Sequence, residues 1–216
     1  MTNDAGILAI WNRCASEMEA DYEVWYQTEH LHERLSILGF RRGRRYQALQ
    51  PEEGYFTYYE TDGPDVLTSG AYRERVDNPT PMTARIMRHA FTDMSRTVCR
   101  QTFVFGEMRG AFAATLQMPR LPPKAWLRDW AGLKTRAPSI ARIEGWQAIE
   151  ETLPASTEAQ IRGGDERIEA CLFIETLRES DCVSVLDHLD SELDLSDAEI
   201  GIYRLLCELT SSQSSP

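Results

Sequence analysis

The sequence predicts an α+β protein built from two tandem ferredoxin-like β-α-β-β-α-β repeats. Apolar or alternating runs typical of strands are separated by segments of helical periodicity, and the same order of elements occurs twice. The two halves also align locally, with W-Q-A at 146–148 on Y-Q-A at 46–48. The predicted repeats span residues 1–109 and 110–210, and a Ser-rich tail at 211–216 is expected to be disordered.

In the first half, clear start and stop signals bound the longest predicted helix. Ser16 stands before the acids Glu17 and Glu19, as an N-cap stands before first-turn acids, and Gly39 follows the last helical residue. Turns that contain Gly or Pro separate the other elements. The expected strands are 6–11, 41–49, 55–60 and 96–107, and the expected helices are 17–38, 65–76 and 82–94.

In the second half, Pro122 and Pro123 open a helix that carries Trp126 and Trp130 one turn apart. The polar stretch 151–165 contains two adjacent glycines and is predicted to be a mobile loop. The expected strands are 111–118, 140–149, 167–177 and 200–209, and the expected helices are 124–136 and 180–189.

Each predicted four-stranded sheet has helices on one face, which leaves its other face uncovered. That face must be buried, and the other repeat is the nearest partner. We therefore expect the two sheets to pack face to face or to curl into a barrel, with the helices outside.

Composition limits the class of protein. The 216 residues carry a net charge of −11, which argues against a surface for nucleic acid or anionic membrane. No apolar run approaches the ~20 residues of a membrane span, and the first residues lack the features of a signal peptide. The five cysteines are odd in number and contain no C-x-x-C pair, so neither a disulfide framework nor a zinc knuckle is expected. A cytoplasmic location is the simplest expectation.

Polar and aromatic chemistry is densest in the stretch 22–46, which contains W-Y-x-x-E-H-L-x-E-R-L at 25–35 and R-R-Y at 44–46. This helix, Gly39-Phe40 and the following strand resemble the dimeric α+β barrel superfamily, and EthD-like proteins in particular. The resemblance implies a pseudo-dimeric α+β barrel. It selects a histidine near the end of the first helix and an Arg-Tyr pair on the next strand, which fall on His30 and on Arg45-Tyr46.

His30 and Arg45 are therefore the expected catalytic residues. A histidine near a helix C-terminus is stabilised as imidazolium and can move a proton near neutral pH, although a surface histidine that only supports the helix end is the alternative. Arg44 or Arg45 could hold a carboxylate or enolate, whereas salt bridges to acidic helices are the plain alternative. No metal site is expected, because His30 and His32 diverge on a helix.

Aromatic side chains are the expected substrate contacts, because Tyr and Trp suit a flat apolar ligand. Ordinary core packing is the alternative for each of them. Glu60, at the end of a predicted strand, would complete the site. The expected substrate-binding residues are Trp25, Tyr26, Tyr46, Tyr58 and Glu60.

Two functions follow. The first is a small-molecule enzyme that acts on an apolar or aromatic substrate: a cofactor-independent monooxygenase, an isomerase or a cyclase, as the resemblance implies. The second is a non-catalytic module for a small ligand or an interaction partner. No cofactor is expected, and nothing in the second half of the sequence supports haem binding. A homodimer is compatible with the sequence. The enzyme requires His30 and Arg45 to face one enclosed cavity.

Overall fold

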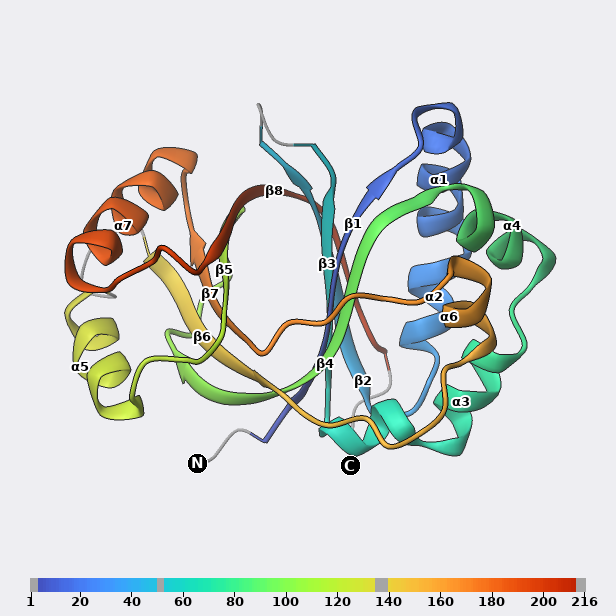
Figure 1. Ribbon diagram of the computed structural model, residues 1–216, viewed down its shortest axis with the longest axis horizontal. Coiled ribbons are helices and arrows are strands. Elements are labelled where there is room, and N and C mark those ends of the chain that lie inside the picture. Colours follow the sequence, from blue (N-terminus) through green and yellow to red (C-terminus); the bar gives the residue numbers. More distant parts are fainter. Residues whose placement is uncertain (1–3, 50–52, 135–139, 213–216) are drawn as a thin grey trace.

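The computed structural model describes residues 4–49, 53–134 and 140–212. Its strands lie close to the predicted segments: β1 (Gly6–Cys14), β2 (Phe40–Ala48), β3 (Tyr55–Thr61), β4 (Phe91–Phe105), β5 (Phe112–Met118), β6 (Ile140–Ala148), β7 (Ala170–Thr176) and β8 (Glu199–Thr210). Neighbouring strands are antiparallel and close a barrel in the order β1-β3-β2-β8-β5-β7-β6-β4 (Figure 1).

The predicted fold class, two tandem ferredoxin-like repeats that form a pseudo-dimeric α+β barrel, is wrong. The described strands of both halves form one closed antiparallel barrel, because β2 pairs with β8 and β4 pairs with β6. Closure gives edge strands main-chain partners that they would otherwise lack. Element spacing in a sequence cannot show which edges pair. The division at residue 109 stays a prediction.

Two long strands join the halves. The first part of β4 pairs with β1 from Phe91 to Arg100, and its last part pairs with β6 from Cys99 to Phe105. In the same way β8 pairs first with β5 and then with β2. Both strands are thus shared between the two sides of the molecule, and the barrel wall is continuous.

Helices cover the barrel on two opposite sides (Figure 1). One side carries η1 (Ser16–Met18), α1 (Glu19–Trp25), η2 (Tyr26–His30), α2 (Leu31–Leu35), η3 (Pro64–Thr68), α3 (Gly70–Asp77), α4 (Pro81–His89) and α6 (Thr157–Arg162). The other carries α5 (Lys124–Lys134) and α7 (Glu179–Glu192). The helix α6 follows β6 in the chain, yet it lies against α2 and α3.

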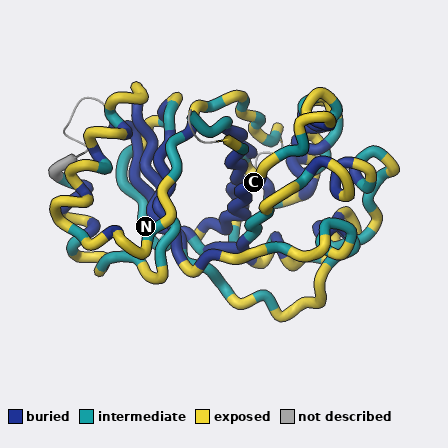
Figure 2. Tube along the Cα trace, turned by 45° about the horizontal axis from the view of Figure 1, so that its top comes forward, coloured by how far each residue is buried: buried dark blue, intermediate teal, exposed yellow. Residues whose placement is uncertain are grey.

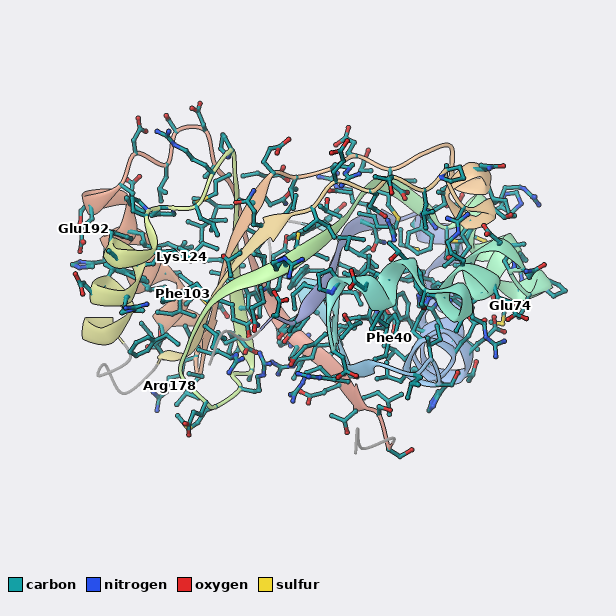
Figure 3. The ribbon with its side chains drawn as sticks, turned by 90° about the horizontal axis from the view of Figure 1, so that it is seen from below. Phe40, Glu74, Phe103, Lys124, Arg178 and Glu192 are labelled. Carbon is teal, nitrogen blue, oxygen red and sulfur yellow. The ribbon has the colours of Figure 1, made fainter. Side chains whose placement is uncertain are left out.

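Alternation of side chains along the strands divides the core into three parts. The barrel interior is aromatic; its largest side chains are Trp11, Tyr46, Phe56, Tyr58, Trp146, Phe173 and Tyr203. Two further clusters lie between the barrel and its helix layers, with Phe40 in one and Phe103 against the other (Figure 3). Figure 2 shows the result: the strands are mostly buried, and exposed residues gather on the helices and loops, although β8 also carries several of them.

Some segments differ from their predictions. The helix expected at 82–94 ends at His89, because Phe91 already pairs with Cys14 of β1. The stretch 151–165, predicted as a mobile loop, contains α6. Parts of the helix 124–136 and of the tail 211–216 lie outside the described residues. Within the described residues, no helix is both long enough and apolar enough to span a bilayer.

Candidate active site between the barrel and its helices

A small cavity lies between the outer wall of the barrel and the helix layer that contains α6. Its volume is about 20 Å³, which is room for about one water molecule. Strands β1, β3 and β4 form its floor, and helices cover it. The polar side chains that line it are Tyr26, His30, Arg34, Tyr59, Tyr72, Arg96, Ser156, Glu158 and Arg162.

His30 is buried in this layer, with 4% of its surface exposed. It ends a π-helical turn, a feature that is frequent at functional sites. Its ring stacks on Trp25 with centroids 4.1 Å apart, and Trp25 is fixed by donating a hydrogen bond to Thr83 (2.9 Å). The Nδ1 atom of His30 has no hydrogen-bond partner among the described residues.

Burial lowers the pKa of His30 well below its usual value, and the nearby guanidinium groups of Arg34, Arg162 and Arg45 lower it further. The ring is therefore neutral at physiological pH. This differs from the expected imidazolium at a helix end, because burial outweighs the helix dipole here. Glu29, which precedes His30, instead accepts hydrogen bonds from Thr80 and Thr83 (both 2.6 Å).

Tyr59 lines the same cavity from β3. Its ring centroid lies 6.2 Å from that of His30, and its buried hydroxyl has no partner among the described residues. Burial and the neighbouring Tyr26 raise the pKa of Tyr59, so the phenol is a neutral donor. An unpaired acceptor or base and an unpaired donor thus line one small space. Buried polar groups without hydrogen-bond partners are rare in proteins. Each one calls for an explanation, such as a catalytic role.

An ion pair between Arg34 and Glu158 closes the cavity. Nη2 of Arg34 donates to both carboxylate oxygens of Glu158 at 2.7 Å, and both side chains are buried. Nη1 of the same arginine donates to Glu33 (3.2 Å). Glu158 belongs to α6, so this pair links the segment that follows β6 to the first helix layer.

A larger hollow of about 250 Å³ adjoins the cavity. The two share Tyr72, Val76, Arg96 and Ser156 in their walls. Residues 151–156 and 164–167 line one side of the hollow, and η3 and α3 line the other. The hollow is thus the natural approach to His30, and the Arg34–Glu158 pair lines the cavity but not the hollow.

Four of the predicted site residues lie in this helix layer: Trp25, Tyr26, His30 and Arg45. Arg45 does not line the cavity. Its two terminal nitrogens donate to Glu23 at 2.7 and 2.8 Å, and its guanidinium lies over three tyrosine rings, with that of Tyr26 4.3 Å away. Arg45 therefore contacts the site only through the Tyr26 ring.

The other three predicted residues, Tyr46, Tyr58 and Glu60, lie on the opposite face of the sheet, inside the barrel. Neighbouring positions on a strand alternate between faces, so Tyr59 faces the helices while Tyr58 and Glu60 face inward. The strand wall separates these residues from His30. The structure does not bring the seven predicted residues together in one place.

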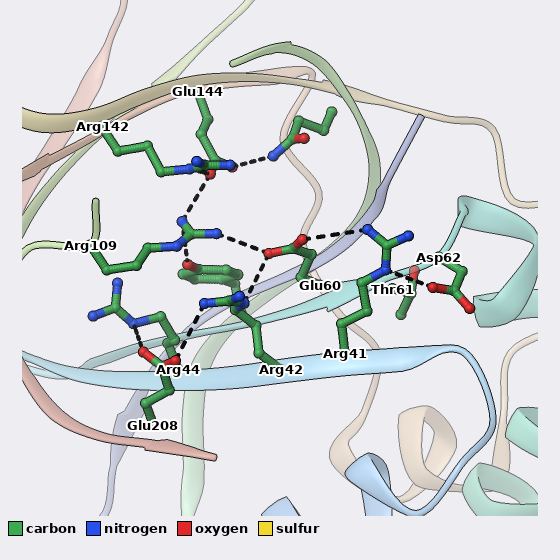
Figure 4. Close-up of polar contacts among 12 residues, drawn as sticks. Arg41, Arg42, Arg44, Glu60, Thr61, Asp62, Arg109, Arg142, Glu144 and Glu208 are labelled. Carbon is green, nitrogen blue, oxygen red and sulfur yellow. Dashed lines mark hydrogen bonds and ion pairs between the residues drawn. The ribbon is translucent and has the colours of Figure 1, made fainter. Parts of the chain in front are cut away.

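The barrel interior ends in a network of buried charges (Figure 4). Arg109, from the connection between β4 and β5, pairs with Glu60 (2.9 Å), Glu144 (2.9 Å) and Glu175 (3.0 Å). It also donates to the Tyr58 hydroxyl (3.1 Å). Arg41, Arg42, Arg44, Arg142, Glu208 and Asp62 also belong to the network. Each carboxylate of this group has an arginine partner, so the network is self-contained.

Sequence reasoning missed Arg34, Tyr59 and Glu158. The sequence around Arg34 is that of a polar helix face, so nothing in it shows that this side chain is buried. The alternation of β3 could have placed Tyr59 on the helix face. Ser156 caps α6 and Gly163 ends it, and these start and stop signals were present in the sequence.

Metal ligation has no geometric support in the described ranges. No group of three or more His, Cys, Asp or Glu side chains there lies close enough to hold a metal ion. The cysteines at 14, 99, 171, 182 and 207 are free thiols.

Comparison with known proteins identifies similar folds only. No family model matches the chain, and no curated protein matches it in sequence. A crystal structure of an anthrone oxidase-like protein matches with a TM-score of 0.60 and 6% identity, over 98% of this chain and 94% of the other. A "putative monooxygenase" from Fusobacterium nucleatum subsp. nucleatum matches with a TM-score of 0.58 and 8% identity, over 97% and 96%. Another from Lactobacillus acidophilus NCFM matches with a TM-score of 0.53 and 8% identity, over 96% and 97%.

Proposed function

We propose that the protein is a small-molecule enzyme of the oxidase or monooxygenase type, with its active site at the His30 cavity. The observation that carries the proposal is that His30 and Tyr59 line the same cavity, while the Nδ1 of His30 and the hydroxyl of Tyr59 have no hydrogen-bond partner among the described residues. The names of the similar structures, an anthrone oxidase-like protein and two monooxygenases, suggest the reaction class.

His30 is suited to remove a proton from an acidic C–H or phenol group of the substrate. Its neutral ring has a free acceptor nitrogen, and Trp25 fixes its plane. Tyr59 is suited to donate a hydrogen bond to the oxygen on which negative charge develops. Tyr26 packs edge-on against His30, and Arg45 acts as a positioning residue through the Tyr26 ring.

The reaction would use O₂ from solution as the oxidant. A CH₂ group between two aromatic rings loses a proton to His30, and the resulting carbanion gives an electron to O₂. The radical pair combines to a peroxide, which takes up the proton. Breaking of the C–H and O–O bonds then releases water and leaves a ketone. One O₂ is consumed and one water is formed for each ketone.

Oxygen uptake with anthrone as substrate tests this proposal. We expect enzyme-dependent O₂ consumption with one anthraquinone formed per O₂. The variant H30Q should reduce kcat at least roughly 100-fold, as expected for loss of a general base, and Y59F should reduce it less. The variant R85Q, altered at an exposed ion pair with Asp21 in the same helix layer but outside the cavity, is the matched control and should keep most of the activity.

Two results separate the alternatives. Conversion of an aromatic substrate at an equal rate without O₂ would favour an isomerase or cyclase over an oxidase. Binding of aromatic ligands without any turnover, unaltered by H30Q, would favour the non-catalytic ligand-binding module and would contradict the proposed enzyme.

A further inference from the structure

The helix α6 is attached to the protein in an unusual way. A short helix normally docks through an apolar face, yet the most buried side chains of α6 are the charged ones of Glu158 and Arg162, and Ile161 is only partly buried. In the covering segment 151–169, Ile168 is the buried apolar residue. The segment is therefore held over the cavity mainly by polar contacts, among them Arg73 with the Pro154 carbonyl (3.0 Å) and Asp77 with the Thr157 amide (3.1 Å).

The covering segment also supplies carboxylates to the arginines of the cavity wall. Glu158 pairs with Arg34 of α2 at 2.7 Å. Glu151 pairs with Arg96 of β4 at 3.3 Å. The two wall arginines are thus neutralised from one segment, and each lies next to the space that a substrate must enter. If the segment moves away, both guanidinium groups lose a carboxylate partner.

We propose that the Glu158 carboxylate occupies the position of an acidic group of the substrate, and that a planar aromatic carboxylate or phenolate displaces it from Arg34. The inference rests on the proposed function, because it names the substrate class of the same site. On displacement of α6, the space at His30 joins the adjoining hollow of about 250 Å³, so an aromatic molecule can reach His30.

Electrostatics favours exchange of one anion for another. Breaking a buried ion pair leaves an unpaired charge, which is strongly unfavourable, whereas a ligand carboxylate at Arg34 restores the pair. Nη1 of Arg34 keeps its contact with Glu33, so Nη2 is the atom that changes partner. A neutral aromatic ligand of the same size that displaces Glu158 leaves Arg34 short of a partner, so it binds more weakly than the anion. Selectivity for anionic ligands follows.

Calorimetric titration of the unaltered protein with 2-naphthoate and with its neutral counterpart 2-naphthalenemethanol tests the inference. We expect the carboxylate to bind at least roughly tenfold more tightly, the equivalent of one charge-assisted hydrogen bond. Amide hydrogen exchange in residues 157–162 should accelerate when 2-naphthoate binds and stay unchanged with the alcohol. Equal affinities, or slower exchange of α6 with the carboxylate, would overturn the proposal.

Variants identify the anion site. E158Q removes the competing charge and should tighten 2-naphthoate binding roughly tenfold, while affinity for the alcohol stays within about twofold. R34M should abolish the preference for the carboxylate. R85Q alters an exposed arginine–carboxylate pair of this helix layer, that with Asp21, and should leave both affinities unchanged. Circular dichroism checks that each variant is folded, and the exchange experiment on the unaltered protein needs no variant.

The two proposals fail separately. If 2-naphthoate displaces α6 but anthrone consumes no O₂, the anion site stands and the oxidase assignment falls. If H30Q abolishes oxidation while E158Q and R34M leave anion binding unchanged, the enzyme assignment stands and the role of Glu158 is wrong.

Discussion

The imidazole of His30 lies on the indole of Trp25, with 4.1 Å between ring centroids and 30° between ring planes. The two residues are five positions apart, a spacing that points in different directions on an α-helix of 3.6 residues per turn. The π-helical turn from Tyr26 to His30 brings them together. A local change in helix geometry thus turns His30 inward to the cavity.

The stability of the protein should depend on the protonation of His30. Its pKa is depressed in the folded state, so the unfolded chain binds a proton that the folded chain does not as pH falls below about 6.5. Stability contributed by the neutral ring is present above that pH and is lost below it, at up to about 1.4 kcal/mol per pH unit. Urea unfolding at pH 7.5 and 5.5 should show this loss in the unaltered protein, and H30Q should lack that part of it. An equal loss in both proteins would contradict a buried neutral His30.

Replacing Tyr59 by Phe should separate stability from activity. The variant removes a buried hydroxyl that has no partner among the described residues, so it should stabilise the fold by about 1 kcal/mol. The same change removes the proposed donor and should lower kcat. Urea unfolding and O₂ uptake measure the two effects. A destabilised Y59F would show that the hydroxyl has a structural partner, for example a bound water.

The pair of Arg45 and Glu23 should respond unequally to removal of each partner. The side chain of Glu23 is 34% exposed and that of Arg45 only 1%, so a lone Glu23 can be hydrated and a lone Arg45 cannot. We expect E23A to cost about 3 kcal/mol, and R45M to cost at least about 1 kcal/mol less. Denaturant unfolding of both variants measures the difference. The opposite order would show that the contacts of Arg45 with the tyrosine rings outweigh its ion pair.

Loss of Arg109 should make the barrel unstable in a pH-dependent way. Burial raises the pKa of Glu144, but Arg109 and Arg142 outweigh it and hold the pKa below its usual value. Glu144 therefore contributes stability above about pH 4.5 that is lost as pH falls. R109M leaves Glu60, Glu144 and Glu175 short of a cation, so we expect a cost of about 3–5 kcal/mol at pH 7.

That cost should shrink on acidification. In R109M, Glu144 loses one of the two arginines that hold its pKa down, so it takes up a proton more readily, and the stability of R109M relative to the unaltered protein should rise between pH 7 and pH 5. Urea midpoints at the two pH values check this. R85Q, at an exposed ion pair with Asp21, is the control and should change stability by less than about 1 kcal/mol at either pH.

Much of the local structure follows from the sequence. The strands and most helices lie where periodicity, caps and turn residues place them, because these signals act between residues close in the chain. Arg44 and Arg45 lie on opposite faces of the sheet, as the alternation of side chains along any strand requires. The sequence did not decide whether His30 is buried, because the sequence of a helix does not show which other segments cover that helix.

What the sequence by itself determined is the series of elements and the concentration of polar chemistry in the stretch 22–46. The tertiary structure alone decided that the described strands close one barrel, that the strand wall divides the predicted site residues into two compartments, and that α6 covers His30. The reason is physical: Glu158 reaches Arg34 across 124 positions of sequence, and no local propensity encodes a contact at that separation. Partner choice among distant charges and strand edges is settled only when the chain is packed.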